Sequence, residues 1–211
     1  MLRKLVKKLI PRGLFRAIEP YGHLAEAVMW NVVMGFPARG MKVIGVTGTD
    51  GKTTTSTMIY SLLNDAGIKT GLMTTIGYGV PGNWHDNYVH MTTMPTRSML
   101  ARIRELKAEG IEWLILETTS HALAQYRVWG VPYSIGVMTN VTHEHLDYHR
   151  TLKRYLAAKV RLFELVGRGQ GLRTGIVNAD DHSQASTTPS QACPTMVDSE
   201  PFRSRSRARK S

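Results

Sequence analysis

The sequence has 211 residues, of which 42% are hydrophobic and 20% are charged, and this composition excludes both wholesale disorder and a fibrous repeat. A single cysteine, Cys193, excludes an internal disulfide framework and a zinc site built from several cysteines. No apolar run reaches the roughly 18 residues that a membrane-spanning helix needs, and no signal peptide is recognisable. We therefore expect a cytoplasmic globular protein.

The formal net charge of +11 lies mostly at the two ends of the chain. Residues 1–16 contain six lysines or arginines and no acidic residue, and the chain closes on an alternation of arginine and serine. The positive and negative charges of the middle are nearly balanced. The excess of positive charge therefore lies in the two ends, and it does not by itself predict binding to nucleic acid. No nucleic-acid partner is expected.

The first 40 residues are predicted to form a basic, helical N-terminal segment. Leu2, Leu5, Leu9 and Ile10 recur at helical spacing among four cations, which predicts a short amphipathic helix that ends near Pro11. Two interpretations remain open for this helix: a weak contact with the surface of an anionic membrane, or docking on the folded body. A second helix, apolar enough to be mostly buried, is predicted over residues 14–36.

Residues 41–182 are predicted to form one domain in which strands and helices alternate. Strands separated by helices pair in parallel through right-handed crossovers, so the predicted fold class is α/β with a doubly wound, mostly parallel sheet. The strands are expected at residues 42–46, 70–75, 113–116, 133–138 and 174–177, and the helices at 53–66, 97–109 and 151–166. The first of these helices is expected to bury an apolar face made of Met58, Ile59, Leu62, Leu63 and Ala66.

Apolar periodicity stops after Asp181, and residues 183–211 are predicted to be a disordered tail rich in Ser, Pro and Arg. The terminal Arg/Ser alternation is compatible with RNA binding. The alternative is a reading frame lost near Asp181, and we prefer it because the break falls directly after a predicted strand.

A glycine-rich loop joins the first predicted strand to the first predicted helix of this domain. The segment GVTGTDGKTTT places glycines at positions 45, 48 and 51, which allow tight turns that direct backbone N–H groups toward phosphate oxygens. The Lys52 side chain can reach the β- and γ-phosphates, and the Thr53 hydroxyl is a ligand for Mg²⁺. The pattern predicts an ATP or GTP site whose contacts come from Gly48, Thr49, Asp50, Gly51, Lys52, Thr53 and Thr54.

Further candidate residues follow from their place on the predicted elements. Glu117 follows the apolar strand WLIL and so places a carboxylate at the carboxyl end of a buried parallel strand, where ligands of such sheets bind. Lys159 shares the apolar stripe of the helix predicted at 151–166, where a lysine is paired, deprotonated or extended past the stripe to solvent. His143, His145 and His149 have a spacing that also permits a zinc site, although no thiol accompanies them.

Eight segments of the chain match one known family in the same order. They are TGTDGKTTT (47–55), TTIG (74–77), TTMP (92–95), ETTSHAL (117–123), QYRV (125–128), TNVTHEHLDYH (139–149), YLAAK (155–159) and NADD (178–181). This set resembles the central ATP-binding domain of the Mur ligases over about residues 41–181. The phosphate loop alone would be shared with folate-adding relatives, whereas SHAL and HLDYH point to the tripeptide-synthetase group.

The resemblance implies an ATP-dependent amide-bond ligase of peptidoglycan precursor synthesis. Such enzymes phosphorylate a substrate carboxylate with ATP, and the amine of an amino acid then displaces phosphate from the acyl phosphate. The implied partners are UDP-N-acetylmuramoyl dipeptide and either diaminopimelate or lysine, which is added as the third residue of the stem peptide. The implied cofactors are ATP and Mg²⁺.

The same resemblance implies roles for particular residues. Lys52, Lys159 and His145 are implied to be catalytic, and Lys159 is implied to be carbamylated by CO₂ so that it helps to place Mg²⁺. The implied metal set is Thr53, Glu117, His145 and carbamylated Lys159. The implied muropeptide contacts are Thr92, Thr93, Ser120, Gln125 and Arg127, and Asn140 and Asn178 are implied to lie near the nucleotide.

The chain also departs from the family. Asp50 stands where the family usually has asparagine, and Glu144 stands where it usually has aspartate, but neither change removes a required chemical group. Full ligases carry a UDP-binding domain before the loop and a further domain after the sheet, so we expect a chain truncated at both ends. Two alternatives stay open: a non-catalytic module that binds nucleotide or muropeptide, and an RNA-associated P-loop ATPase.

Overall fold

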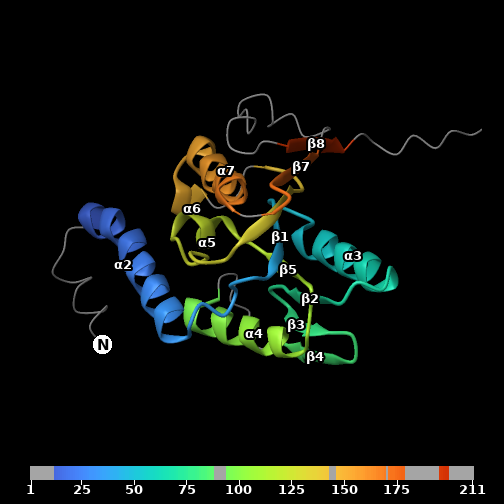
Figure 1. Ribbon diagram of the computed structural model, residues 1–211. Coiled ribbons are helices and arrows are strands. Elements are labelled where there is room, and N and C mark those ends of the chain that lie inside the picture. Colours follow the sequence, from blue (N-terminus) through green and yellow to red (C-terminus); the bar gives the residue numbers. More distant parts are fainter. Residues whose placement is uncertain (1–11, 88–93, 143–145, 170, 179–194, 200–211) are drawn as a thin grey trace, which may run out of the picture.

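The computed structural model describes residues 12–87, 94–142, 146–169, 171–178 and 195–199 (Figure 1). These residues form one sheet of eight strands in the order β4-β3-β2-β5-β1-β6-β7-β8. The strands are β1 (Lys42–Thr47), β2 (Thr70–Met73), β3 (Gly77–Val80), β4 (Asn83–Asp86), β5 (Trp113–Glu117), β6 (Tyr133–Met138), β7 (Thr174–Asn178) and β8 (Thr195–Ser199). The helices are α2 (Arg12–Val33), α3 (Lys52–Asp65), α4 (Thr96–Ala108), α5 (Ser120–Ala124), α6 (Leu146–His149) and α7 (Leu152–Arg168).

The sheet confirms the predicted doubly wound α/β class. From β2 to β8 in the sheet order, each strand pairs in parallel with the next. β1 lies in the middle of the sheet. The strands β2 to β5 extend the sheet on one side of β1, and β6 to β8 extend it on the other. This order puts the carboxyl ends of β1 and its two neighbours, β5 and β6, at one edge of the sheet.

The sequence did not predict the antiparallel hairpin of β3 and β4 at the edge of the sheet. Two of the four residues of β3, Gly77 and Gly79, lack the side chains that mark a strand in sequence. At Gly79 the neighbouring backbone is so close that an added Cβ would lie 2.8 Å from the Cα of Trp84. Glycine here permits the close pairing of the hairpin and at the same time removes its sequence signal.

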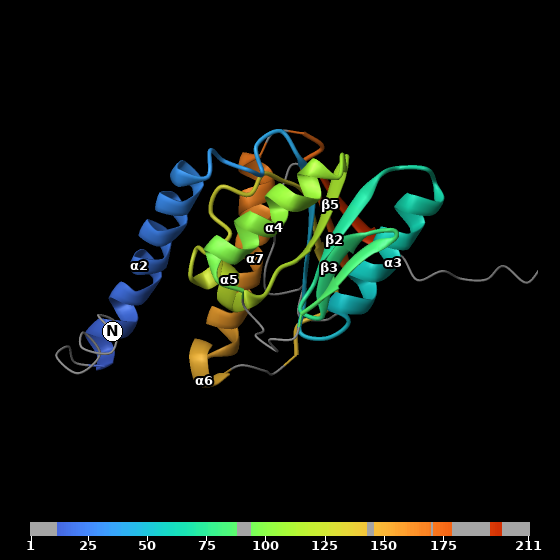
Figure 2. The ribbon, with the colours of Figure 1, turned by 90° about the horizontal axis from the view of Figure 1, so that it is seen from below.

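Helices cover both faces of the sheet (Figure 2). α3 lies on one face, where Ile59 and Leu63 pack against a core that contains Ile44. α4, α5 and α7 lie on the other face, over a larger core that contains Val43 and Phe163. Neighbouring residues of β1 therefore face two different cores, which is why this central strand is apolar along its length.

The predicted inward face of α3 is only partly correct. Ile59 and Leu63 do pack on the sheet, but the Met58 and Leu62 side chains are 60% and 66% exposed. Buried Ser56 begins the contacting row, which continues at helical spacing through Ile59 and Leu63. A helix touches a sheet along a narrow strip, so apolar residues one position off that strip stay in solvent.

α2 confirms the helix predicted at residues 14–36, with an earlier end. Gly35 and Phe36 both have positive φ, 68° and 55°, so the helical hydrogen-bond pattern stops at Val33. The helix lies beside α4, and the Arg97 guanidinium of α4 sits 4.8 Å from the Trp30 ring centroid. The expectation that α2 is mostly buried is wrong, because several of its apolar side chains face solvent, among them Val33, which is 67% exposed.

The C-terminal part of the chain also differs from expectation. Residues 195–199 form β8, which pairs in parallel with β7 in the register Thr174↔Thr195 to Asn178↔Ser199. The disordered tail predicted from residue 183 is therefore wrong for these five residues, and its remainder lies outside the described residues. The helix predicted at residues 2–10 lies outside them too, and the predicted domain boundaries stay predictions. Among the described helices, none combines the length and apolarity that crossing a membrane requires.

Candidate functional site

The predicted phosphate loop connects β1 to α3 at the carboxyl edge of the sheet. Gly48 and Gly51 have φ of 154° and 74°, and α3 begins at Lys52. The Lys52 ammonium folds back over the loop and donates to the Thr49 carbonyl oxygen at 2.6 Å. The positive end of the α3 dipole and the Lys52 ammonium therefore lie together at this loop, and this arrangement favours a bound phosphate.

Asn140, in the loop after β6, holds the phosphate loop in shape. Its Oδ1 accepts from the backbone N–H groups of Thr49 at 3.2 Å and Asp50 at 2.9 Å, while its Nδ2 donates to the Asp50 carbonyl oxygen at 3.2 Å. The Thr139 hydroxyl donates to the same carbonyl at 2.6 Å. The N–H groups of Thr49 and Asp50 are therefore engaged by Asn140, and a phosphate would meet the first N–H groups of α3. The structure brings Asn140 to the loop itself.

Glu117 lies at the carboxyl end of β5, as predicted, and it contacts the residue that follows Lys52. Its Oε2 accepts from the Thr53 hydroxyl at 2.9 Å and from the Thr75 backbone N–H at 3.2 Å. The Thr75 hydroxyl is 3.4 Å from the same oxygen. A carboxylate beside a threonine hydroxyl is a set of hard oxygen donors that fits Mg²⁺. Thr75 was not singled out from sequence, although it lies in the quoted TTIG segment.

The third implied metal ligand, His145, lies outside the described residues, as does His143 of the zinc alternative. His149 is buried, and its Nε2 lies 3.1 Å from the Ser120 Oγ. Within the described residues, no cluster of three or more His, Cys, Asp or Glu side chains has the spacing of a metal site. Of the implied metal set, the structure brings Thr53 and Glu117 into contact, and their binding of a metal stays a prediction.

Lys159 is buried, as the apolar stripe of α7 predicted, with only 1% of its surface exposed. Its Nζ lies 4.4 Å from the centroid of the Tyr155 ring. The Tyr155 hydroxyl in turn lies 3.1 Å from the Thr49 hydroxyl of the phosphate loop. Tyr155 therefore connects the buried lysine to the loop, a role that the spacing of apolar residues along the helix does not reveal.

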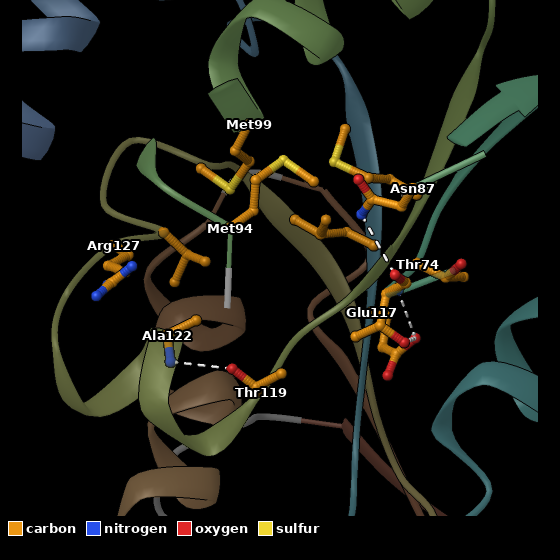
Figure 3. Close-up of a pocket in the computed structure, with 12 residues that line it drawn as sticks. Thr74, Asn87, Met94, Met99, Glu117, Thr119, Ala122 and Arg127 are labelled. Atoms are coloured by element: carbon orange, nitrogen blue, oxygen red, sulfur yellow. Dashed lines mark hydrogen bonds between the residues drawn. The ribbon is translucent and has the colours of Figure 1, made fainter. Parts of the chain in front are cut away.

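Glu117 also lines a pocket (Figure 3). Methionine side chains form much of its apolar wall, and Glu117 and Thr75 belong both to this pocket and to the contacts around the phosphate loop. Arg127 lies at the opposite end of the pocket from Glu117 (Figure 3). The residues that line it are Met73, Thr74, Thr75, Asn87, Met94, Met99, Leu116, Glu117, Thr119, Ala122, Arg127 and Val128.

The implied substrate contacts divide into lining and supporting residues. Arg127 lines the pocket, and its Nε donates to the Gln125 Oε1 at 2.7 Å. Gln125 is buried and donates through Nε2 to the Tyr148 hydroxyl at 3.1 Å, while buried Ser120 contacts His149. These two residues support the wall and are not among those that line the pocket. Thr92 and Thr93 lie outside the described residues.

Asn178 ends β7, two strands from β1 in the sheet, and is half-buried. Its strand runs parallel to β6, whose following loop carries Asn140. The structure thus puts Asn178 at the same edge of the sheet as the phosphate loop. The part of its predicted role that involves the nucleotide stays a prediction.

The fold and this loop define the class of the protein: a nucleotide-binding α/β domain with a phosphate loop at the carboxyl edge of a parallel sheet. The Mur ligase middle-domain family model matches residues 46–199. The chain therefore belongs to the Mur ligase family.

Relatives in the family agree with this assignment. The chain is 43% identical over 163 residues to a UDP-N-acetylmuramyl-tripeptide synthetase of Deinococcus radiodurans, with 77% of this chain and 32% of the relative covered. It is 40% identical over 145 residues to a UDP-N-acetylmuramoyl-L-alanyl-D-glutamate–2,6-diaminopimelate ligase of Coxiella burnetii, with 69% and 28% covered. The chain thus spans about a third of the length of these relatives.

Solved structures show the same fold. A UDP-N-acetylmuramoyl-L-alanyl-D-glutamate–2,6-diaminopimelate ligase matches with a TM-score of 0.65 and 30% identity, over 76% of this chain and 32% of that one. A folylpolyglutamate synthase of Mycobacterium tuberculosis, complexed with ADP and AMPPCP, matches with a TM-score of 0.66 over 83% of this chain and 46% of that one. At 12% identity, this match shows only that the two chains share a fold.

Proposed function

We propose that this chain is the ATP-binding and phosphoryl-transferring domain of an amide-bond ligase that adds the third residue of the peptidoglycan stem peptide. The observation that supports this most is the position of Glu117, which bonds to Thr53 of the phosphate loop and also lines the pocket. A nucleotide on the loop and a substrate in the pocket would meet at this carboxylate. We expect the reaction to occur in the cytoplasm, where ATP is available.

The reaction needs two successive displacements. An oxygen of the substrate carboxylate attacks the γ-phosphorus of ATP, the bond from that phosphorus to the bridging oxygen breaks, and ADP leaves. The amine of the amino acid then attacks the acyl carbon, a C–N bond forms, inorganic phosphate leaves and the amine loses a proton. Phosphorylation is required because a carboxylate by itself is a poor electrophile.

The residues of the loop suit the first displacement. Two anions must approach each other, and the Lys52 ammonium and the N-terminus of α3 supply positive charge where the phosphates would lie. Thr53 and Glu117 would hold Mg²⁺, which neutralises phosphate charge when it is bound, and His145 is proposed as a further ligand. Lys159, buried behind Tyr155, is proposed to carry a carbamate that helps to position this metal.

The pocket suits the acceptor. Arg127 lines the pocket, and a planar guanidinium can bind a carboxylate of a UDP-N-acetylmuramoyl dipeptide in a bidentate manner. The Gln125 carbonyl oxygen holds the Nε of this guanidinium, which fixes its plane. The incoming amino acid is proposed to be diaminopimelate or lysine.

The test uses the full 211-residue chain. We expect ATP to bind in the presence of Mg²⁺, and Lys52→Ala to weaken binding by about 10- to 150-fold, since a charge-assisted contact contributes roughly 1.5–3 kcal/mol. Lys69→Ala, which removes an exposed lysine next to β2, is the matched control and should bind as the parent does.

The second measurement is phosphate release from ATP. Release that requires both UDP-N-acetylmuramoyl dipeptide and diaminopimelate or lysine would support the ligase proposal, and we expect it where this domain acts together with the other domains of a full ligase. Nucleotide binding by this chain, with no such release from a protein that carries all of those domains, would favour a non-catalytic binding module. Release stimulated by RNA, and lost when residues 200–211 are deleted, would favour an RNA-associated ATPase.

A further inference from the structure

Asn87 lines the pocket and also contacts the connection between β2 and β3. It is the first residue after β4, and its side chain belongs to the same pocket wall as Glu117 (Figure 3). Its backbone N–H donates to the Ile76 carbonyl oxygen at 2.8 Å, and its Nδ2 donates to the Thr75 carbonyl oxygen at 3.3 Å. Two donors of one residue therefore hold two successive carbonyl groups of this connection.

The connection that Asn87 holds carries one of the donors to Glu117. We call residues 74–76, which join the antiparallel strands β2 and β3, the Thr75 loop. The Thr75 N–H donates to the Glu117 Oε2 at 3.2 Å, and the same oxygen accepts from the Thr53 hydroxyl at 2.9 Å. Asn87 therefore holds the backbone of the residue that holds the carboxylate.

Arg102 of α4 fixes the direction in which the Asn87 amide points. Its Nη2 donates to the Asn87 Oδ1 at 3.0 Å. A guanidinium has donors and no acceptor, so the amide oxygen must face it, and the amide nitrogen is thereby directed to the Thr75 carbonyl oxygen. The guanidinium is itself held by the Tyr78 ring, whose centroid lies 4.5 Å from its Cζ, and the Tyr78 hydroxyl donates to Glu105 of the same helix at 3.0 Å.

These contacts form one continuous line from α4 to the phosphate loop. The line runs from Arg102 through Asn87 and the Thr75 loop to Glu117, and it ends at Thr53 in the first turn of α3. A glutamate side chain has three rotatable bonds, so an N–H donor that is itself held in place limits the directions in which the carboxylate can face.

We propose that Asn87 is a positioning residue for the Glu117 carboxylate and that it acts through the Thr75 loop. By holding this loop, Asn87 keeps the carboxylate beside Thr53, where Mg²⁺ would bind. Removing a group that orients a metal ligand lowers metal affinity by about 10- to 100-fold. This inference rests on the proposed function, because the metal belongs to that proposal.

Two substitutions of Asn87 separate its links. Asn87→Leu keeps the size and the neutrality of the side chain and removes both side-chain links. Asn87→Asp keeps an acceptor for Arg102, but its second oxygen would face the Thr75 carbonyl oxygen, so only the link to the Thr75 loop is lost. The matched control is Asn83→Leu in β4, which likewise removes a side-chain hydrogen bond, from the exposed Asn83 Nδ2 to Glu109.

Amide hydrogen exchange, followed by NMR on the full chain in EDTA, tests the line of contacts without any metal. The Thr75 N–H is bonded to Glu117, and it should exchange about fivefold faster or more in both Asn87 variants, because the loop that carries it opens more often. The Asn83 control should exchange at Thr75 as the parent does, and circular dichroism melting should show that the variants are folded. A Thr75 N–H that keeps the parent's rate in either folded Asn87 variant overturns the inference.

Titration of ATP at several Mg²⁺ concentrations tests the consequence for the metal. Asn87→Leu is used because it adds no charge near Glu117, and the Mg²⁺ concentration that it needs for half of the full ATP affinity should rise about tenfold, with affinity in EDTA unchanged. A parent that requires Mg²⁺ and an Asn87→Leu variant with the same requirement would overturn this inference and leave the proposed function standing. A parent that binds ATP equally with and without Mg²⁺ would instead overturn the metal site of the proposed function, and with it the role of Asn87 toward that metal.

Discussion

The Thr53 hydroxyl donates to the Glu117 carboxylate at 2.9 Å, and this contact joins the first turn of α3 to the last residue of β5. The two residues are 64 positions apart in sequence. They meet because β1 and β5 are parallel neighbours, with Val46 opposite Glu117, so the loop after β1 starts beside the end of β5. A divalent cation bound between them would touch both the nucleotide loop and the pocket.

The first prediction concerns this pair. Glu117→Gln keeps the size of the side chain and removes its charge, so we expect ATP affinity in Mg²⁺ to fall about tenfold or more, while affinity in EDTA changes little. Titration of ATP with and without Mg²⁺ measures both. Glu112→Gln, at the exposed residue just before β5, is the control. Equal Mg²⁺ dependence in parent and Glu117 variant would remove Glu117 from the metal site.

The second prediction concerns Lys159. Lys159→Ala should impair phosphoryl transfer more than ATP binding, because the proposed carbamate acts on the metal and not on the nucleotide directly. Short carboxylates such as acetate should restore part of the transfer by entering the space that the side chain leaves. Lys153→Ala, at an exposed position of the same helix, should leave both unchanged. Equal losses of binding and transfer would argue against a role in placing the metal.

The third prediction concerns Tyr155. Tyr155→Phe removes the hydroxyl that bonds to Thr49 and keeps the ring beside Lys159. One hydrogen bond contributes about 1 kcal/mol, so ATP affinity should fall roughly fivefold. Thermal melting should drop by only a few degrees. Tyr60→Phe, on the helix across the sheet, should not change affinity, and a Tyr155 variant that binds ATP as the parent does would show that the loop needs no support from α7.

The fourth prediction concerns Gly48. Its φ of 154° is one that residues with a Cβ rarely adopt, and an added Cβ would collide with the Thr139 hydroxyl that supports the loop. Gly48→Ala should therefore destabilise the fold by about 2 kcal/mol or more and abolish ATP binding. Denaturant unfolding and ATP titration measure the two effects. Gly22→Ala, at a helical position with open space, should be neutral or stabilising, and an equally tolerant Gly48 would contradict the loop geometry.

The fifth prediction is a pH dependence. Burial raises the pKa of Tyr133 far above its usual value, and its hydroxyl lies 3.0 Å from the Thr118 hydroxyl. The unfolded chain loses this proton near pH 10 and the folded chain does not, so unfolding releases a proton above that pH. The contribution of Tyr133 to the free energy of unfolding should be fully present below pH 10 and should be lost as the pH rises further.

Tyr133→Phe should make the unfolding free energy less dependent on pH between 10 and 11, although it also leaves Thr118 without this contact. Tyr21→Phe, at a residue that is 64% exposed, should keep the dependence of the parent. Guanidinium unfolding at several pH values gives both slopes. Identical slopes in the parent and the Tyr133 variant would show that this phenol does not set the alkaline limit.

Local patterns in the sequence were enough to identify the framework of the site. The apolar run WLIL placed Glu117 at a strand end, and the stripe of α7 predicted that Lys159 is buried. The buried apolar residues of α4 have the same helical spacing; they are Met99, Leu100, Ile103 and Leu106. Each of these features repeats within one element, at the period that its backbone geometry imposes, so neighbours in sequence are sufficient to show it.

Contacts between distant parts of the chain were decided by the tertiary structure. The support of the phosphate loop by Asn140, the contact of Thr75 with Glu117 and the bond from Tyr155 to Thr49 all depend on which strands lie side by side and in what register. Packing likewise selected the row of α3 that meets the sheet, and it left Met29, Val32 and Val33 of α2 exposed to solvent. Periodicity tells which faces of an element are apolar, but only the arrangement of its neighbours determines which of those faces is covered.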